Sequence, residues 1–331
     1  MNSLPPEDET SPFEPEWRQW LAENLLRGVP HTQLVNTLVK AGVEEEVARA
    51  SLAVELRDPY LQGALRAAQM HWKLEGLLEV YRQLFEQSGA HQQVPRPQQL
   101  TPSEFFERYY FRNQPVVVRG ALEDVSTLGT WTWKRVTGQM DGLQVEPILE
   151  GTPTAPLTVR EWARRNSAGE SGLACWASAP LLEREDLRPL ASVLLPPRGY
   201  TAEGLHASGA RLWLEAVGAG PPPIPARRNL LLGPLSGRRS LQLIPSFELA
   251  RLRGGLSPEQ SSPAQASAPL CLEVALETPE LVMIPVGWWF RSLALEPGLW
   301  VSFEAFAAPE PNTSWRSPEP GEAVPTPYPR E

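Results

Sequence analysis

Apolar residues recur every three or four positions over the first part of the chain, the spacing of helices that bury one face. The second such stretch closes at Gly42, which predicts a helix end there. Asp58 followed by Pro59 gives a helix cap with proline in the first turn, and a long amphipathic pattern follows up to Gly89. The pattern predicts an all-helical module over residues 16–89.

From residue 100 the pattern changes. Thr101-Pro102-Ser103-Glu104 is a capping box with proline at the first helical position. Beyond it, short β-rich runs are separated by glycine and proline. Many short strands with few helices between them favour a sandwich or barrel over a parallel α/β sheet. We expect strands at 115–119, 145–149, 173–177, 212–217, 230–232, 241–244, 272–276, 281–286 and 299–306.

The segments between and beyond these two regions differ in composition. Residues 1–15 combine acidic residues with proline and carry no basic residue, which predicts a disordered acidic leader. The proline-containing stretch 90–99 is expected to link the helical module to a domain over residues 100–308. Residues 309–331 are proline-rich and are expected to form a disordered tail.

Composition narrows the classes of partner. The chain has 331 residues with 30 Lys and Arg against 39 Asp and Glu, a net charge of −9. This balance argues against nucleic acid and anionic membranes as partners. No apolar run is long enough to cross a bilayer, and the N-terminus lacks the basic and apolar regions of a signal peptide. We therefore expect a cytoplasmic protein.

Several segments in order resemble one known family. The stretch from Phe105 to Gly120 resembles the entry segment of cupin-like, JmjC-type proteins. Residues 211–213, 229–232 and 236–245 are similar to that family's central strands, and 281–289 and 301–303 to its last two. The resemblance covers about residues 100–307. It implies an α+β fold, a double-stranded β-helix (cupin/JmjC jelly roll) preceded by an all-helical N-terminal module, as in some bacterial members.

The resemblance also implies where an iron site would lie. The family is best known for oxygenases that use Fe(II), 2-oxoglutarate and O₂, with iron held by two histidines and a carboxylate. The ungapped match between Trp213 and Gly237 puts the first two ligands at Ile224 and Ala226, and the third falls at Phe290. None of these side chains can bind iron. We therefore expect a degenerate member with no catalytic residue, no metal and no cofactor.

One feature of the family's site has a counterpart. The basic residue that pairs with the far carboxylate of the 2-oxo acid aligns with Arg239. If the strand alternates regularly from Ile224, Ala226 and Arg228 share its inward face. Arg228 and Arg239 together are then a candidate site for a small anion, since arginine binds carboxylates bidentately. A solvated or salt-bridged arginine is the alternative for each of them.

Two functions of different class follow. The first is a pseudoenzyme that acts by protein binding or scaffolding and holds a small anion. The alternative is an Fe(II)/2-oxoglutarate-type oxygenase with an unconventional metal site that uses His206, or with altered chemistry in the same cavity. The resemblance implies a homodimer or another protein partner, because helices flanking related folds often pair. The long helix after Asp58 is the expected place for such a contact.

Overall fold

The computed structural model describes residues 15–90, 92–122, 130–140, 142–149, 152–168, 176–204, 208–216, 223–235, 237–252, 269–293, 296–310 and 312–315. The chain divides into two compact units, Met1–Gln83 and Leu84–Glu331, and each is described by itself. Within the described ranges, no helix is both long and apolar enough to span a membrane.

The first unit is helical, as predicted. It consists of α1 (Pro15–Leu26), α2 (His31–Lys40), α3 (Glu45–Glu55) and most of α4 (Pro59–Gln87). The Asp58 carboxylate caps α4 by accepting hydrogen bonds from the backbone N–H of Tyr60 at 2.8 Å and of Leu61 at 2.9 Å. The small core of this unit contains Leu21, Leu25, Leu34, Val35, Leu38, Ala48, Leu52 and Leu61.

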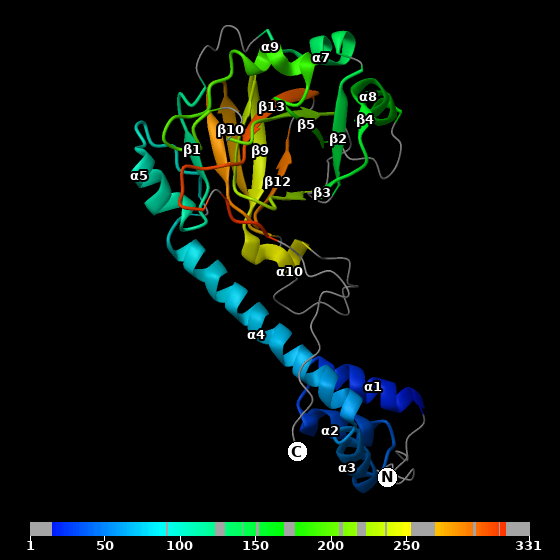
Figure 1. Ribbon diagram of the computed structural model, residues 1–331. Coiled ribbons are helices and arrows are strands. Elements are labelled where there is room, and N and C mark those ends of the chain that lie inside the picture. Colours follow the sequence, from blue (N-terminus) through cyan, green and yellow to red (C-terminus); the bar gives the residue numbers. More distant parts are fainter. Residues whose placement is uncertain are drawn as a thin grey trace, which may run out of the picture. The chain divides into compact units, whose positions relative to one another are not determined.

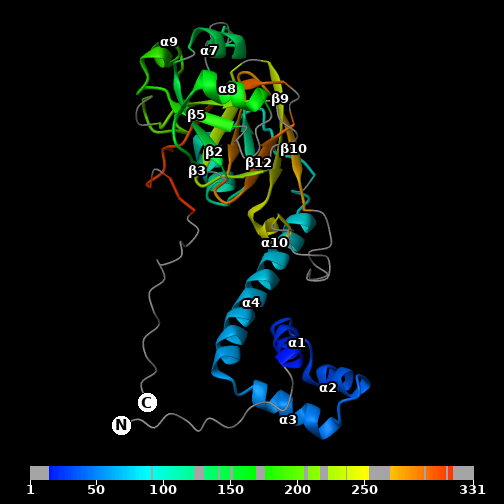
Figure 2. The ribbon, with the colours of Figure 1, turned by 90° about the vertical axis from the view of Figure 1, so that its right-hand side faces the viewer.

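The second unit begins with a short helical segment, α5 (Pro102–Phe105), followed by a π-helical turn over Phe106–Tyr110. The predicted capping box is confirmed, because the Thr101 hydroxyl accepts from the Glu104 backbone N–H and the Glu104 carboxylate accepts from that of Thr101. Among its described residues the further α-helices are α7 (Trp133–Gln139), α8 (Val159–Ser167), α9 (Arg188–Ala191) and α10 (Leu249–Leu252). Figures 1 and 2 show α7 and α9 at the same end of this unit.

The strands of the second unit form two antiparallel sheets, so the fold is α+β. Within the described residues the larger sheet has the order β1-β11-β8-β13-β6-β5-β2-β3, with β4 beside β2, and the smaller has the order β10-β9-β12-β7. The larger sheet comprises β1 (Val116–Val118), β2 (Gln144–Leu149), β3 (Thr152–Pro153), β4 (Leu157–Thr158), β5 (Trp176–Pro180), β6 (Arg211–Glu215), β8 (Leu230–Pro234), β11 (Leu281–Ile284) and β13 (Gly298–Phe303). The smaller comprises β7 (Ile224–Pro225), β9 (Arg238–Ile244), β10 (Leu272–Glu277) and β12 (Trp289–Ser292).

Alternating side chains of the larger sheet belong to two different cores, which explains its continuous apolar runs. In β6, Leu212 and Leu214 pack into the core that contains helical residues such as Trp162, whereas Trp213 packs into the other. That second core also contains Leu241 and Phe290 of the smaller sheet. The two sheets therefore pack face to face, as layers that Figure 1 shows around β9, β12 and β13.

Two predicted boundaries differ from the structure. Residues 92–99 do not separate the two units: the division falls within α4, and Val94 is buried in the inter-sheet core. Arg96 also forms an ion pair with Glu280 at 3.1 Å. Contacts with the second unit also continue beyond residue 308, where Asn312 and Trp315 hydrogen-bond to the chain near Asn229. The rest of the predicted tail, 316–331, and the predicted leader as far as residue 14 lie outside the described residues.

Candidate functional site

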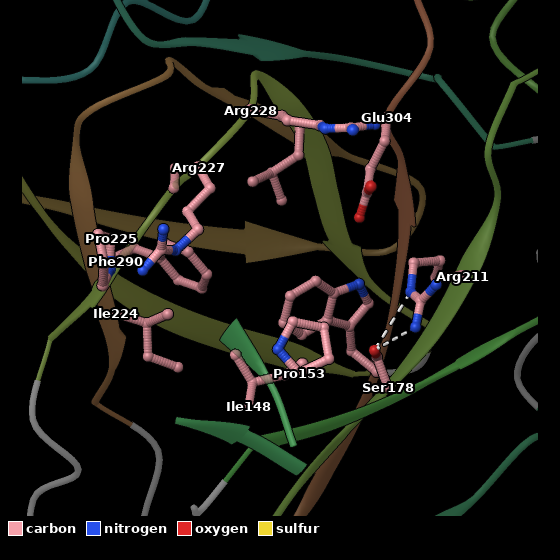
Figure 3. A pocket seen from close by; sticks show the side chains of 13 residues that line it. Ile148, Pro153, Ser178, Arg211, Ile224, Pro225, Arg227, Arg228, Phe290 and Glu304 are labelled. Carbon is pink, nitrogen blue, oxygen red and sulfur yellow. Dashed lines mark hydrogen bonds between the residues drawn. The ribbon is translucent and has the colours of Figure 1, made fainter. Parts of the chain in front are cut away.

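The three positions aligned with iron ligands meet at one cavity. Ile224, Ala226 and Phe290 all line a cavity of about 290 Å³ (Figure 3). Phe290 of β12 lies opposite Ile224 of β7 in the smaller sheet. The backbone N–H of Ala226 donates to the carbonyl of Trp288 at 2.7 Å, which extends this pairing past the end of β7. Sheet pairing thus gathers residues that lie more than sixty positions apart in the chain.

Aromatic side chains fill much of the space beside these positions. Trp176 packs against Phe290, Trp213 and Trp300, with ring centroids 5.7–5.9 Å apart, and all four side chains are buried. The Trp213 indole N–H donates to the Ser302 hydroxyl at 2.7 Å, and that of Trp300 donates to the Glu215 carboxylate at 2.9 Å. We call Trp176, Trp213, Phe290 and Trp300 the aromatic cluster. Its members come from both sheets, so it joins them across the inter-sheet core.

A polar side of the cavity is built on β2, β5 and β6. Arg211 donates to the Ser178 hydroxyl from Nε at 3.2 Å and from Nη2 at 2.8 Å (Figure 3). Nη2 also forms an ion pair with the Glu146 carboxylate. Strand pairing brings these groups together. Glu146 of β2 lies opposite Ser178 of β5, and Arg211 of β6 lies opposite Pro180, two residues further along β5. Arg211 is therefore already held by neighbours of its own sheet.

Glu304 projects into the cavity just after the end of β13. Burial raises the pKa of its carboxyl group, whereas the positive charges of Arg211 and Arg228 act to lower this pKa and Glu146 acts to raise it. Arg228 is exposed and also lines the cavity. Arg228 and Glu304 are thus an electrostatically attracting pair at the cavity wall.

Arg227 differs from Arg211 and Arg228, the other two arginines that line the cavity. It lines the cavity on the side formed by Ile224, Pro225 and Phe290 (Figure 3). Its Nε is buried and has no hydrogen-bond partner in the part of the chain that the structure describes. An arginine stays protonated at any ordinary pH, so this buried donor is a place where an acceptor would be stabilising.

The structure does not bring Arg239 to this cavity. The Arg239 guanidinium donates to the backbone carbonyls of Glu296 at 2.8 Å and Pro297 at 2.6 Å. Its charge acts on Glu215, at the opposite end of β6 from Arg211. Those two positions are four residue steps apart along the strand, about 13 Å. The structure therefore places Arg228 beside the positions aligned with iron ligands and does not place Arg239 there.

A short C-terminal segment holds two parts of the cavity wall. The Asn312 side chain accepts from the backbone N–H of Asn229 at 3.1 Å and donates to the backbone carbonyls of Asn229 and Glu304. The backbone N–H of Trp315 donates to the Arg227 carbonyl at 2.7 Å, and the Trp315 ring packs on Trp289. The segment thus fixes the backbone next to Arg228 and at Glu304.

The residues present do not fit the iron site that the resemblance implies. Ile224, Ala226 and Phe290 offer no side-chain donor atom, and Glu304 supplies the one carboxylate among the described lining residues. No cluster of three His, Cys, Asp or Glu suited to a metal ion occurs within the described ranges. His206, which one form of the oxygenase alternative uses as a metal ligand, lies outside those ranges. No step of metal chemistry is derived for this cavity.

Sequence reasoning singled out Ile224, Ala226, Phe290 and Arg228 but missed Arg211, Ser178 and Glu304. The sequence held a weak signal for two of the missed residues. Arg211 begins the strand that contains Trp213, and Glu304 directly follows the strand that contains Trp300. Neither a protein-family model nor a curated protein matches the chain.

Proposed function

We propose that the second unit is a double-stranded β-helix of the JmjC type that has lost its iron site and acts by binding. One observation carries this proposal: Phe290, at the position of the third ligand, is part of the aromatic cluster. A large ring packed against the indoles of Trp176 and Trp213 occupies space that an iron ion and a 2-oxo acid need. Two antiparallel sheets packed face to face support the proposed fold class.

The binding role has two parts. The cavity retains about 290 Å³ of space with arginines at its wall, so it is proposed to take a small anionic molecule. The role of a scaffold or partner subunit is assigned to the helical unit. There, Met70, Leu74, Leu77 and Tyr81 of α4 are each between 49 and 60% exposed. We call these four residues the α4 seam.

The proposed partner for the α4 seam is a second copy of this chain. Its members are spaced by four, three and four residues, which is the 3.5-residue repeat of helices that wind around each other. Each copy presents the same seam, so two copies bury it through a self-complementary contact. Leu61 of the same helix packs instead into the core of its own unit.

The experiment that tests the loss of the iron site is anaerobic reconstitution with Fe(II) and 2-oxoglutarate, followed by elemental analysis of the protein. Near-zero iron per chain is the expected result. About one iron per chain would overturn the proposal and favour an oxygenase with an unconventional metal site. A parallel sample of the Phe290→His variant tests whether a single restored imidazole is enough, and we expect that it is not, since the other two positions still lack donors.

A further inference from the structure

We propose that the cavity binds a small carboxylic acid with an apolar body, held by a contact between its carboxylate and Arg227. This inference rests on the proposed binding function and names the ligand class of that site. It uses an arginine other than the two that the sequence suggested. The cavity volume, about 290 Å³, is at the lower end of the range for small-molecule sites, so the ligand is small.

The charges around the cavity favour an anion at Arg227. Arg211 forms an ion pair with Glu146, and Arg228 attracts Glu304. Arg227 has no corresponding carboxylate among the described residues, and its buried Nε lacks an acceptor. Three arginines against two carboxylates leave one positive charge in excess. A ligand carboxylate supplies both the missing charge and the missing acceptor.

The walls near Arg227 favour an apolar body on that acid. Figure 3 shows Arg227 on the same side as Ile224, Pro225 and Phe290, with Glu304 and Arg211 across the cavity. The apolar lining also includes Trp213, Leu230 and Ile148. An inorganic anion would leave these side chains facing water, whereas a hydrocarbon or aromatic group would cover them.

The test compares three probes by isothermal titration calorimetry on the full chain: phenylacetate, its neutral isostere phenylacetamide, and acetate. We expect phenylacetate to bind about tenfold or more tightly than phenylacetamide, because a charge-assisted hydrogen bond contributes at least that much. Acetate is expected to bind more weakly than phenylacetate, since it lacks the apolar group. Loss of the preference in Arg227→Gln, with intermediate affinity in Arg227→Lys, is the expected response to mutation.

The matched control is Arg238→Gln, an exposed arginine of β9 whose partner is the exposed Glu277 at 3.7 Å. It should bind phenylacetate like the unaltered chain. Equal affinity for acid and amide, a preference that persists in Arg227→Gln, or no binding of phenylacetate at millimolar concentration would each overturn the inference. Uptake of one iron per chain would instead overturn the proposed function, so the two failures are distinguishable. Urea unfolding of Arg227→Gln shows whether that variant is folded.

Discussion

Asn312 and Asn229 form a reciprocal pair: Oδ1 of Asn312 accepts from the backbone N–H and the side-chain Nδ2 of Asn229, both at 3.1 Å, and Nδ2 of Asn312 donates to the Asn229 carbonyl at 2.8 Å. Asn229 Oδ1 in turn accepts from the Val286 backbone N–H at 2.8 Å. Through this pair the C-terminal segment is tied to β8 and to the end of β11. The cavity wall therefore depends on residues that follow the last strand.

Asn312→Ala is expected to destabilise the second unit by about 1–3 kcal/mol, because it leaves partly buried donors and acceptors of Asn229 unpaired. Equilibrium unfolding in urea measures the change. Thr313→Ala is the control, since Thr313 is exposed and adjacent in the chain. Equal stability of the two variants would show that the Asn312–Asn229 pair contributes nothing to the fold.

Phe290→Ala is expected to cost about 3–5 kcal/mol, since it removes a buried ring from the aromatic cluster and leaves a hole between the sheets. The comparison is Phe111→Ala, whose ring is 63% exposed and whose removal should cost about 1 kcal/mol or less. Urea unfolding monitored by tryptophan fluorescence gives both values. A loss at Phe290 as small as the loss at Phe111 would contradict the tight packing of the Phe290 ring in the aromatic cluster.

The Glu215 carboxyl should make stability fall as pH rises. Burial raises its pKa above the ordinary value, although hydrogen bonds from Ser292 and Trp300 and the charge of Arg239 oppose this rise. The folded chain therefore binds this proton more tightly than the unfolded chain does. Its contribution to the free energy of unfolding is largest below the ordinary pKa and decreases as pH rises through the folded pKa.

Glu215→Gln removes this titration and keeps an acceptor for the Trp300 indole. Its stability relative to the unaltered chain should therefore increase between about pH 4 and pH 8. Urea unfolding at several pH values tests this expectation. A difference that stays constant with pH would contradict it. Glu304→Gln should behave in the same direction, because burial also raises the pKa of Glu304.

The α4 seam predicts a dimer that charge can disrupt. Leu74→Glu with Leu77→Glu places two carboxylates in the seam, and we expect the chain to become monomeric in light scattering after size-exclusion chromatography. The control adds the same charge outside the seam, at the exposed Gln69→Glu and Gln83→Glu. A monomer for the unaltered chain, or a dimer that survives in the seam variant, would contradict the proposed self-association.

Local patterns predicted the elements better than they predicted the site. The capping box at Thr101 and the strand runs around Val117 and Val282 were predictable, because they depend on neighbours in the chain. The position of the Arg239 guanidinium could not be predicted from the sequence for a geometric reason. A strand pattern indicates which face of the sheet a residue is on, but not which backbone carbonyls its guanidinium contacts. The alternation from Ile224 was also incomplete, since β7 ends at Pro225.

Long-range contacts account for the remaining differences. Val94 and Arg96 occupy a proline-containing stretch typical of a linker, yet Val94 packs between the sheets and Arg96 pairs with Glu280, 184 positions away. Similarly, Asn312 lies among prolines but bonds to Asn229. Amino-acid composition indicates how a segment behaves on its own. Val94, Arg96 and Asn312 are instead ordered by contacts with residues that are distant in the sequence.

The aromatic cluster gives this protein an optical property of its own. The Trp176 and Trp300 indoles have centroids 5.7 Å apart and planes inclined by 43°, and Trp213 lies 5.9 Å from Trp176. The transition dipoles of indoles at this distance and inclination interact with each other. The folded chain should therefore show an exciton couplet in its circular dichroism spectrum. All three indoles lie on neighbouring strands of the larger sheet, β5, β6 and β13. The part of the couplet that is lost in Trp176→Phe therefore reports the packing of this sheet face independently of any change in helix content.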